Sequence, residues 1–325
     1  MTLYHAEYAW VDDRPRPDVL IEVRQGRFAA VRPGTPAPAG ATRLPGLTLP
    51  GFANAHSHAF HRALRGRTQA GEGTFWTWRE RMYEVAARLD PDTYLALATA
   101  AYAEMALAGV VCVGEFHYLH HDRDGRRYAD PNAMGAALIE AAARAGVRLT
   151  LLDTCYLAAT VDGAPLAGVR RRFGDGDAEA WAARVSRLPA SDGHARLGAA
   201  VHSVRAVPAA QIPTVVAWAA ARDAPLHLHL SEQPAENEAC LAVHRRTPTE
   251  LLAEAGALGP RTTAVHATHL AGRDRATLGA TGTGVCLCPT TERDLADGIG
   301  PGRALADAGC PVSLGSDSHA VVDLF

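Results

Sequence analysis

The stretch "LPGFANAHSHAFHRA", from Leu49 to Ala63, places three histidines within six residues, just after an apolar run. Side chains that are two residues apart on a strand project to the same face. His56 and His58 therefore point the same way, while the small Ser57 between them points to the other face. We interpret this stretch as a strand whose end presents two imidazoles side by side.

Seven further segments are short apolar, β-branched runs that finish in His, Glu, Asp, Tyr or Ser: "GVVCVGEFHY", "VRLTLLDTCY", "ARLGAAVHS", "APLHLHLSE", "TTAVHATHL", "GVCLCPTTE" and "CPVSLGSDSH". Between them lie helix candidates, including residues 91–109, 131–146 and 208–223. In an eight-stranded (β/α) barrel, the carboxyl ends of the strands converge on one mouth that carries the chemistry. The pattern predicts an α/β fold of this TIM-like type. An open doubly wound sheet is the alternative, but no GxGxxG follows a first strand.

The sequence pattern of the first 48 residues differs from that of the rest of the chain. Residues 1–48 contain short alternating segments broken by Gly and Pro, which predict small antiparallel strands. We therefore expect a β-strand-rich appendage over 1–48, part of a composite β domain, and the barrel over 49–325. The sequence stops at "AVVDLF", a few residues after the eighth strand. This predicts a barrel that lacks its last helix and its C-terminal tail.

Composition narrows the class of protein. The formal net charge of −3, with no basic block, argues against nucleic acid or an anionic membrane as a partner. The sequence contains neither a run of ~18 apolar residues nor a secretory signal. The six scattered cysteines form no CxxC pair and indicate reduced thiols in the cytoplasm. All 32 basic residues are arginines, which excludes a Schiff-base lysine and a carbamylated lysine that bridges two metals.

Several of the polar residues at the strand ends are of types that bind metal ions. Zinc binds nitrogen, sulfur and oxygen donors, and a catalytic zinc site keeps room for a water. His56 and His58 offer two nitrogens on the first barrel strand. On the fifth strand His227 and His229 share a face, and His229 is favoured because it lies nearer the carboxyl end. Asp317 at the end of the eighth strand offers a carboxylate, as a ligand or as a base.

Two more polar groups belong to the same mouth. Glu232 follows His229 by three residues, where it could hand a proton to a bound substrate. His266 ends the sixth strand and could stabilise or deprotonate a water at the metal. His269, three residues further on, is out of phase for a strand and is expected on the following loop.

These strand ends resemble the amidohydrolase superfamily, and the chain's lack of lysine matches its mononuclear, deaminase-like members. The resemblance extends to the formimidoylglutamate deiminase family within it, over blocks spread from residue 49 to 319. The motifs that carry it are "LPGFANAHSHAFHRA", "FWTWRERMY", "EFHYLHHD", "VHSVRAV", "HLHLSEQ", "VHATH" and "GSDSH".

The resemblance implies a barrel of the metal-dependent hydrolase type with one Zn²⁺ per chain, although iron or manganese also suits such ligands. The implied metal ligands are His56, His58, His229 and Asp317, and the implied catalytic residues are Glu232, His266 and Asp317. The implied substrate-binding residues are Arg79, Tyr118, His202 and Arg205, with Arg81 as the competitor of Arg79. His61 stands where the family has Gln; it could contact the substrate, and its role is left open.

The implied reaction is the hydrolytic deimination of N-formimidoyl-L-glutamate to N-formyl-L-glutamate and ammonia, in histidine degradation. Such a substrate has two carboxylates, which the planar guanidinium of arginine binds through a bidentate fork. A homodimer is compatible with the resemblance. Two other hypotheses remain: a deaminase of a cyclic amidine such as guanine, cytosine or a triazine, and a chain that is inactive because it is truncated.

Overall fold

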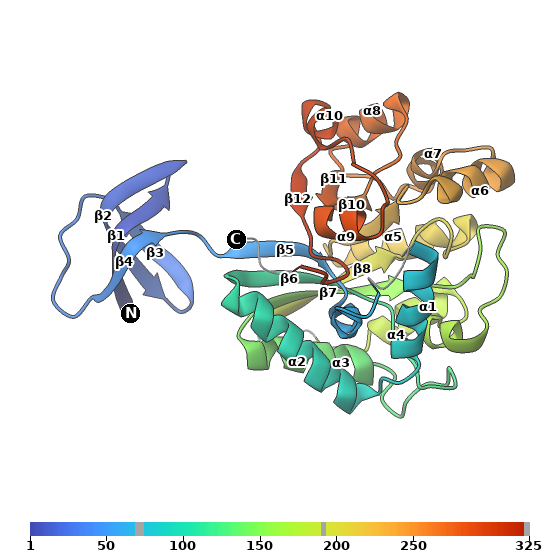
Figure 1. Cartoon of the computed structure of the whole chain (residues 1–325), viewed down its shortest axis with the longest axis horizontal. Helices are drawn as coiled ribbons and strands as arrows, with labels where there is room; N and C mark the ends of the chain where they lie inside the picture. The colour runs from blue at the N-terminus through green and yellow to red at the C-terminus, as the bar shows by residue number, and fades with distance from the viewer. Residues whose placement is uncertain (69–74, 190–192, 322–325) are drawn as a thin grey trace. The chain divides into compact units, whose positions relative to one another are not determined.

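The chain forms two compact units, Met1–Phe52 and Ala53–Phe325, each with its own sheet (Figure 1). The structure, a computed structural model, describes residues 1–68, 75–189 and 193–321.

The first unit is a four-stranded sheet in the order β3-β2-β1-β4, built from β1 (Thr2–Val11), β2 (Arg14–Arg24), β3 (Arg27–Arg32) and β4 (Thr42–Thr48). The first three strands pair antiparallel, as predicted. β4 pairs parallel with β1, so the expectation of antiparallel strands is wrong for β4. The connection 33–41 is long enough to carry the chain back along the sheet, whereas a two-residue turn imposes an antiparallel neighbour.

The second unit contains the eight predicted barrel strands in sequence order, each parallel to its paired neighbour. They are β5 (Phe52–Ser57), β6 (Val110–His117), β7 (Arg148–Cys155), β8 (Ala195–Val201), β9 (Leu226–Leu230), β10 (Thr262–His266), β11 (Gly284–Leu287) and β12 (Val312–Leu314). Each is shorter than its predicted segment; in β11 and β12, for example, the polar residues that follow the apolar run belong to the loops of the mouth. The predicted α/β barrel with an N-terminal β appendage is confirmed.

The barrel closes where the segment after β12 meets β5. A parallel bridge joins Ser57 and Asp317, and the Asp317 N–H donates to the carbonyl of His56 at 3.0 Å. This approach depends on Gly315, because a Cβ there would lie 2.7 Å from the Cβ of His56. The closing seam thus brings Asp317 directly beside the "HSH" motif.

Helices surround the strands, and α2 packs on β6, α3 on β7 and α5 on β8. The helices are α1 (Phe75–Ala86), α2 (Pro91–Leu107), α3 (Ala133–Ala145), α4 (Ala178–Val185), α5 (Ile212–Ala221), α6 (Pro234–His244), α7 (Pro248–Glu254), α8 (Gly272–Ala280), α9 (Pro289–Asp294) and α10 (Gly302–Asp307), with 3₁₀ turns η1 (Ala59–Leu64), η2 (Gly168–Phe173) and η3 (Ala209–Gln211).

The helix boundaries follow from local capping. Asp90 caps α2, because its Oδ1 accepts from the Thr93 N–H at 3.0 Å while Thr93 Oγ1 accepts from the Asp90 N–H. α3 ends at Gly146, whose φ of 77° suits glycine. In the described part of the chain, no helix has the length and apolar character needed to cross a membrane.

A buried ion cluster ties α4 to the barrel wall. The guanidinium of Arg184 on α4 donates to both carboxylate oxygens of Asp153 on β7, at 2.7 and 2.9 Å. Its Nε donates to Asp175, and all three side chains are buried. In spite of burial, Arg184 holds the pKa of Asp153 below its usual value. The cluster therefore places a satisfied arginine between two carboxylates.

Replacing Arg184 by methionine is expected to destabilise the fold by about 3–5 kcal/mol, because Asp153 and Asp175 lose their buried cation. Urea unfolding measures the free energy. Arg144→Met is the matched control: Arg144 pairs with Glu140 on the exposed face of α3, where an ion pair contributes about 0.5 kcal/mol or less. A loss for Arg184→Met no larger than that of the control would contradict the assignment.

Candidate active site

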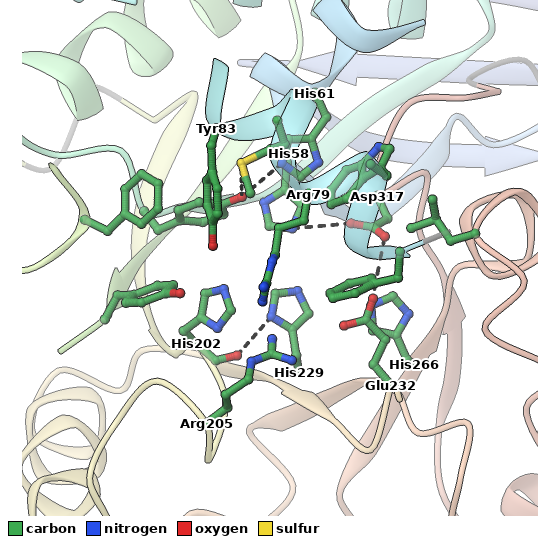
Figure 2. A pocket seen from close by; sticks show the side chains of 17 residues that line it. His58, His61, Arg79, Tyr83, His202, Arg205, His229, Glu232, His266 and Asp317 are labelled. Carbon is green, nitrogen blue, oxygen red and sulfur yellow. Dashed lines mark hydrogen bonds and ion pairs between the residues drawn. The ribbon is translucent and has the colours of Figure 1, made fainter. Parts of the chain in front are cut away.

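One pocket lies at the mouth formed by the polar strand ends. Figure 2 shows the side chains that line it. Every predicted site residue except His56 is among them: His58, His61, Arg79, Tyr118, His202, Arg205, His229, Glu232, His266 and Asp317. His56 is fully buried beside His58 and His229. The barrel therefore brings together residues that lie up to about 260 positions apart in the sequence.

The predicted metal ligands converge on one point. Nε2 of His56 lies 3.1 Å from Nε2 of His58 and 3.2 Å from Nε2 of His229. Oδ1 of Asp317 lies 3.3 Å from Nε2 of both His56 and His58. Three imidazole nitrogens and one carboxylate oxygen thus face each other. These side chains include one of the groups in the described residues that could hold a metal ion, His56 with His58 and His229.

Hydrogen bonds on the far side of the rings orient these nitrogens. Nδ1 of His58 donates to the carbonyl of Phe116 at 2.8 Å, and Nδ1 of His229 donates to the carbonyl of His202 at 2.9 Å. Each ring then presents an unprotonated Nε2 to the centre. Burial lowers the pKa of His58 and His229, and lowers that of His56 to about 3. Neutral lone pairs that face one another repel, so this donor set fits a divalent cation.

His266 and Glu232 lie against Asp317. Nε2 of His266 is 3.7 Å from Oε1 of Glu232 and 3.9 Å from Oδ2 of Asp317. Burial alone would lower the pKa of His266, but its carboxylate neighbours raise it to about 10. Burial raises the pKa of Glu232, whereas the histidines around Asp317 hold its pKa well below the usual range in spite of burial. Two carboxyl groups with pKa values moved in opposite directions suit one acid and one base.

The backbone is strained where these side chains leave their strands. Ser231, His266 and Asp317 have φ values of 50°, 68° and 46°, in the left-handed region that non-glycine residues rarely occupy. Such strain persists only where the surrounding structure imposes it, and it concentrates at functional sites. Here it turns the chain sharply at the barrel mouth.

Two arginines occupy the other side of the pocket. Figure 2 shows Arg79 and Arg205 entering it with their guanidinium groups pointing toward one another. Arg205 has a carboxylate partner, Oε2 of the buried Glu236, at 3.5 Å. The Arg79 guanidinium lies 4.5 Å from the ring centre of Trp76, and no acidic side chain in the described ranges pairs with it. Two cations that face each other create a site for anionic groups.

The competitor Arg81 does not enter the pocket. It lies on the exposed side of α1, where its guanidinium pairs with Glu84 at 3.1 Å. Residues two apart on a helix point in different directions, and the α-helical period therefore separates Arg79 from Arg81.

Tyr118, His61 and His202 lie beside the metal-ligand cluster. The Tyr118 hydroxyl and His61 Nε2 are 2.9 Å apart, and the His61 ring lies 4.5 Å from that of His58. His202 packs between Tyr156 and His229, with ring centres 4.3 and 5.0 Å away. His227, the alternative to His229, does not line the pocket. His269 lies on the loop, as expected, and its Nε2 donates to the Asp297 carbonyl.

Several residues that line the pocket were not predicted from the sequence. Tyr156 ends the third predicted barrel strand in the same manner as the other polar ends, and that signal could have found it. Phe173, Met82 and Leu295 carry no such signal, because an apolar residue on a loop or helix is indistinguishable from core. Glu236, which contacts Arg205, lies outside the strand-end pattern. Glu292, which contacts His266, ends the segment "GVCLCPTTE", so the strand-end signal could have found it.

Comparison with known proteins identifies the family of this chain. The model of the amidohydrolase family matches residues 47–325. The chain is 41% identical to formimidoylglutamate deiminase of Pseudomonas aeruginosa over 98% of its own length and 71% of that protein. It is 31% identical to 8-oxoguanine deaminase of the same organism, over 85% of this chain and 61% of that one.

A solved structure agrees over the whole fold. The crystal structure of an amidohydrolase from Brucella melitensis superimposes with a TM-score of 0.93 at 34% sequence identity, over 100% of this chain and 73% of that one. The similarity therefore includes both the barrel and the N-terminal sheet.

Proposed function

Since the chain belongs to the amidohydrolase family of hydrolases, we propose that it is a zinc-dependent deiminase of N-formimidoyl-L-glutamate in histidine degradation. The products are N-formyl-L-glutamate and ammonia. The observation that carries the proposal is a single pocket with a three-histidine, one-carboxylate donor set on one side and two inward-pointing arginines on the other. The 41% identity to a formimidoylglutamate deiminase supports it.

The arginines hold the two carboxylates of the glutamate part. A guanidinium binds a carboxylate through two parallel N–H donors, so one arginine serves each carboxylate. Arg205 is held by Glu236, whereas Arg79 lies over aromatic rings and has no acidic partner among the described residues. The Tyr118 hydroxyl lines the same pocket, where it can donate to the bound substrate.

The chemistry takes place beside Asp317. His56, His58, His229 and Asp317 would hold Zn²⁺, which would supply Lewis acidity at this point of the pocket. Asp317, with His266 next to it, takes a proton from the attacking water. Glu232, whose pKa burial raises, gives a proton to the formimidoyl nitrogen. Water adds to the amidine carbon, the C–N bond to the terminal nitrogen breaks, and ammonia leaves.

A deaminase of a cyclic amidine is the second candidate. The 31% identity to 8-oxoguanine deaminase favours it, as do the aromatic walls, where Tyr156 and Phe173 lie with ring centres 5.4 Å apart. A flat heterocycle stacks on such rings, but it does not require two guanidinium groups. The two candidates therefore differ in how much the arginines matter.

Ammonia release from N-formimidoyl-L-glutamate and from guanine, cytosine and a triazine, by the zinc-loaded chain, separates the candidates. Arg79→Ala and Arg205→Ala are each expected to raise KM for the linear substrate by about 10- to 100-fold, the equivalent of hydrogen bonds to a charged group. Arg81→Ala is the matched control on the same helix, and its KM is expected to stay unchanged. Turnover of a ring amidine that is insensitive to both arginines would replace the proposal with the second candidate.

A further inference from the structure

Glu292 is a buried carboxylate that the proposed chemistry does not use. It lies on the short helix α9, which follows β11, and only 5% of its surface is exposed. Its Oε1 accepts the N–H of Cys288 at 2.8 Å and lies 3.3 Å from Nδ1 of His266. The carboxylate thus contacts the catalytic histidine on the side that faces away from the pocket.

The two nitrogens of His266 have different surroundings. Nε2 faces Glu232 and Asp317, while Nδ1 faces Glu292. The ring also stacks on His229, with ring centres 5.5 Å apart and an angle of 17° between the planes. Stacking fixes the plane of the ring, but it does not determine which of the two nitrogens faces the pocket. The hydrogen bond at Nδ1 fixes that orientation.

His266 needs such support because its backbone is strained. Its φ is 68°, and that of Ala267 after it is 52°. The strand ends at this point, so no further β pairing holds the side chain in place. Side-chain contacts must therefore orient the ring, and Glu292 supplies the one at Nδ1.

We propose that Glu292 is a positioning residue for the reaction: it accepts the Nδ1–H of His266 and so keeps Nε2 directed at Glu232 and Asp317. This inference rests on the proposed function, which gives His266 its role. With its Nδ1–H held by Glu292, the ring keeps Nε2 next to the two carboxylates at the pocket. Without Glu292, a flipped or tilted ring becomes populated.

The same atoms also raise the question of a second metal ion. His266, Cys288 and Glu292 offer three ligand atoms close together. Glu292 Oε1, however, already accepts a backbone N–H, and the Nδ1–H of His266 completes its hydrogen bonding without a cation. Metal content per chain separates the two interpretations, so it belongs in the test.

The test compares zinc-loaded wild type with Glu292→Ala and Glu292→Gln. Glu292→Ala is expected to lower kcat by about 10- to 100-fold, the usual effect of losing such an outer partner, with KM and one zinc per chain unchanged. Glu292→Gln keeps an acceptor oxygen and is expected to recover a large part of kcat. The kinetic comparison uses whichever substrate the wild type turns over. It can therefore be made even if N-formimidoyl-L-glutamate proves not to be a substrate.

An NMR measurement on His266 tests the proposal without any substrate. In ¹⁵N-histidine-labelled protein, His266→Asn identifies the signals of this ring, and wild type is expected to show a hydrogen-bonded Nδ1–H whose signal shifts in Glu292→Ala. Glu250→Ala is the control, because Glu250 also accepts a backbone N–H at a helix start, that of Thr247, but does not line the pocket.

Three results would overturn the proposal. The first is a kcat for Glu292→Ala equal to wild type. The second is an unchanged His266 signal in that variant. The third is two metal ions per wild-type chain and one in Glu292→Ala, which would assign Glu292 to a second metal site. Should Glu292→Ala fail to fold, Glu292→Gln decides alone. A kcat that falls while the Nδ1–H signal of His266 stays as in wild type contradicts the role, and so does a signal that shifts while kcat stays at the wild-type value.

Discussion

Stripping the chain of its metal with a chelator is expected to abolish ammonia release, and added zinc is expected to restore it. Nε2 of His56 lies 3.1 Å from Nε2 of His58 and 3.2 Å from Nε2 of His229, and Nδ1 hydrogen bonds keep the Nε2 atoms of His58 and His229 unprotonated. A bound cation relieves this repulsion, so it also stabilises the fold: a ligand at 100 times its Kd contributes about 2.7 kcal/mol. Metal analysis, ammonia release and the thermal midpoint measure the three effects on the same sample.

The fifth barrel strand offers a matched pair for this prediction. His229→Asn is expected to lose both the metal and ammonia release. His227→Asn, two residues earlier on β9, is expected to keep both, because His227 is buried away from the pocket. One equivalent of zinc in His229→Asn, with normal turnover, would show that the metal is held elsewhere.

Replacing Glu232 by glutamine is expected to lower kcat by about 10²–10⁴-fold, the usual contribution of a general acid or base. Burial raises the pKa of Glu232, so its carboxyl group holds a proton more readily than an exposed glutamate does. Glutamine has nearly the same shape but cannot transfer that proton. Zinc content is expected to stay at one per chain, because Glu232 is outside the converging ligand atoms.

Steady-state kinetics and metal analysis check this prediction together. Glu238→Gln, on the exposed face of α6, makes the same chemical change without touching the pocket and is expected to leave kcat unchanged. A kcat for Glu232→Gln close to wild type would remove Glu232 from the chemistry. Loss of zinc would instead identify it as a ligand.

The barrel was predictable because its signal is local and repeated. Each strand is an apolar run of the right length that finishes polar, and some adjoining helices are bounded by caps such as Asp90 and Gly146. The parallel pairing of β4 was not predictable from the same signals. Alternation of apolar and polar residues identifies a strand, but the direction of its neighbour depends on the path of the connection.

The site was predictable where residue type and strand phase coincide. His56 and His58 share a face by the period of a strand, and the barrel geometry brings His229 and Asp317 to the same mouth. The position of a residue around a helix also explains why pocket residues on helices were harder to predict. On α1, a shift of two residues decides between Arg79 in the pocket and Arg81 in solvent.

The sequence by itself determined the fold class, the chemical types at the barrel mouth and, through the absence of lysine, the kind of metal site that is excluded. Only the tertiary structure decided which apolar side chains form the pocket walls, that Arg79 and Arg205 face each other, and that Glu236 and Glu292 hold Arg205 and His266. The physical reason is the range of the interactions. Strand phase and capping act between residues close in the chain, whereas these contacts depend on how separate βα units pack, which no local pattern encodes.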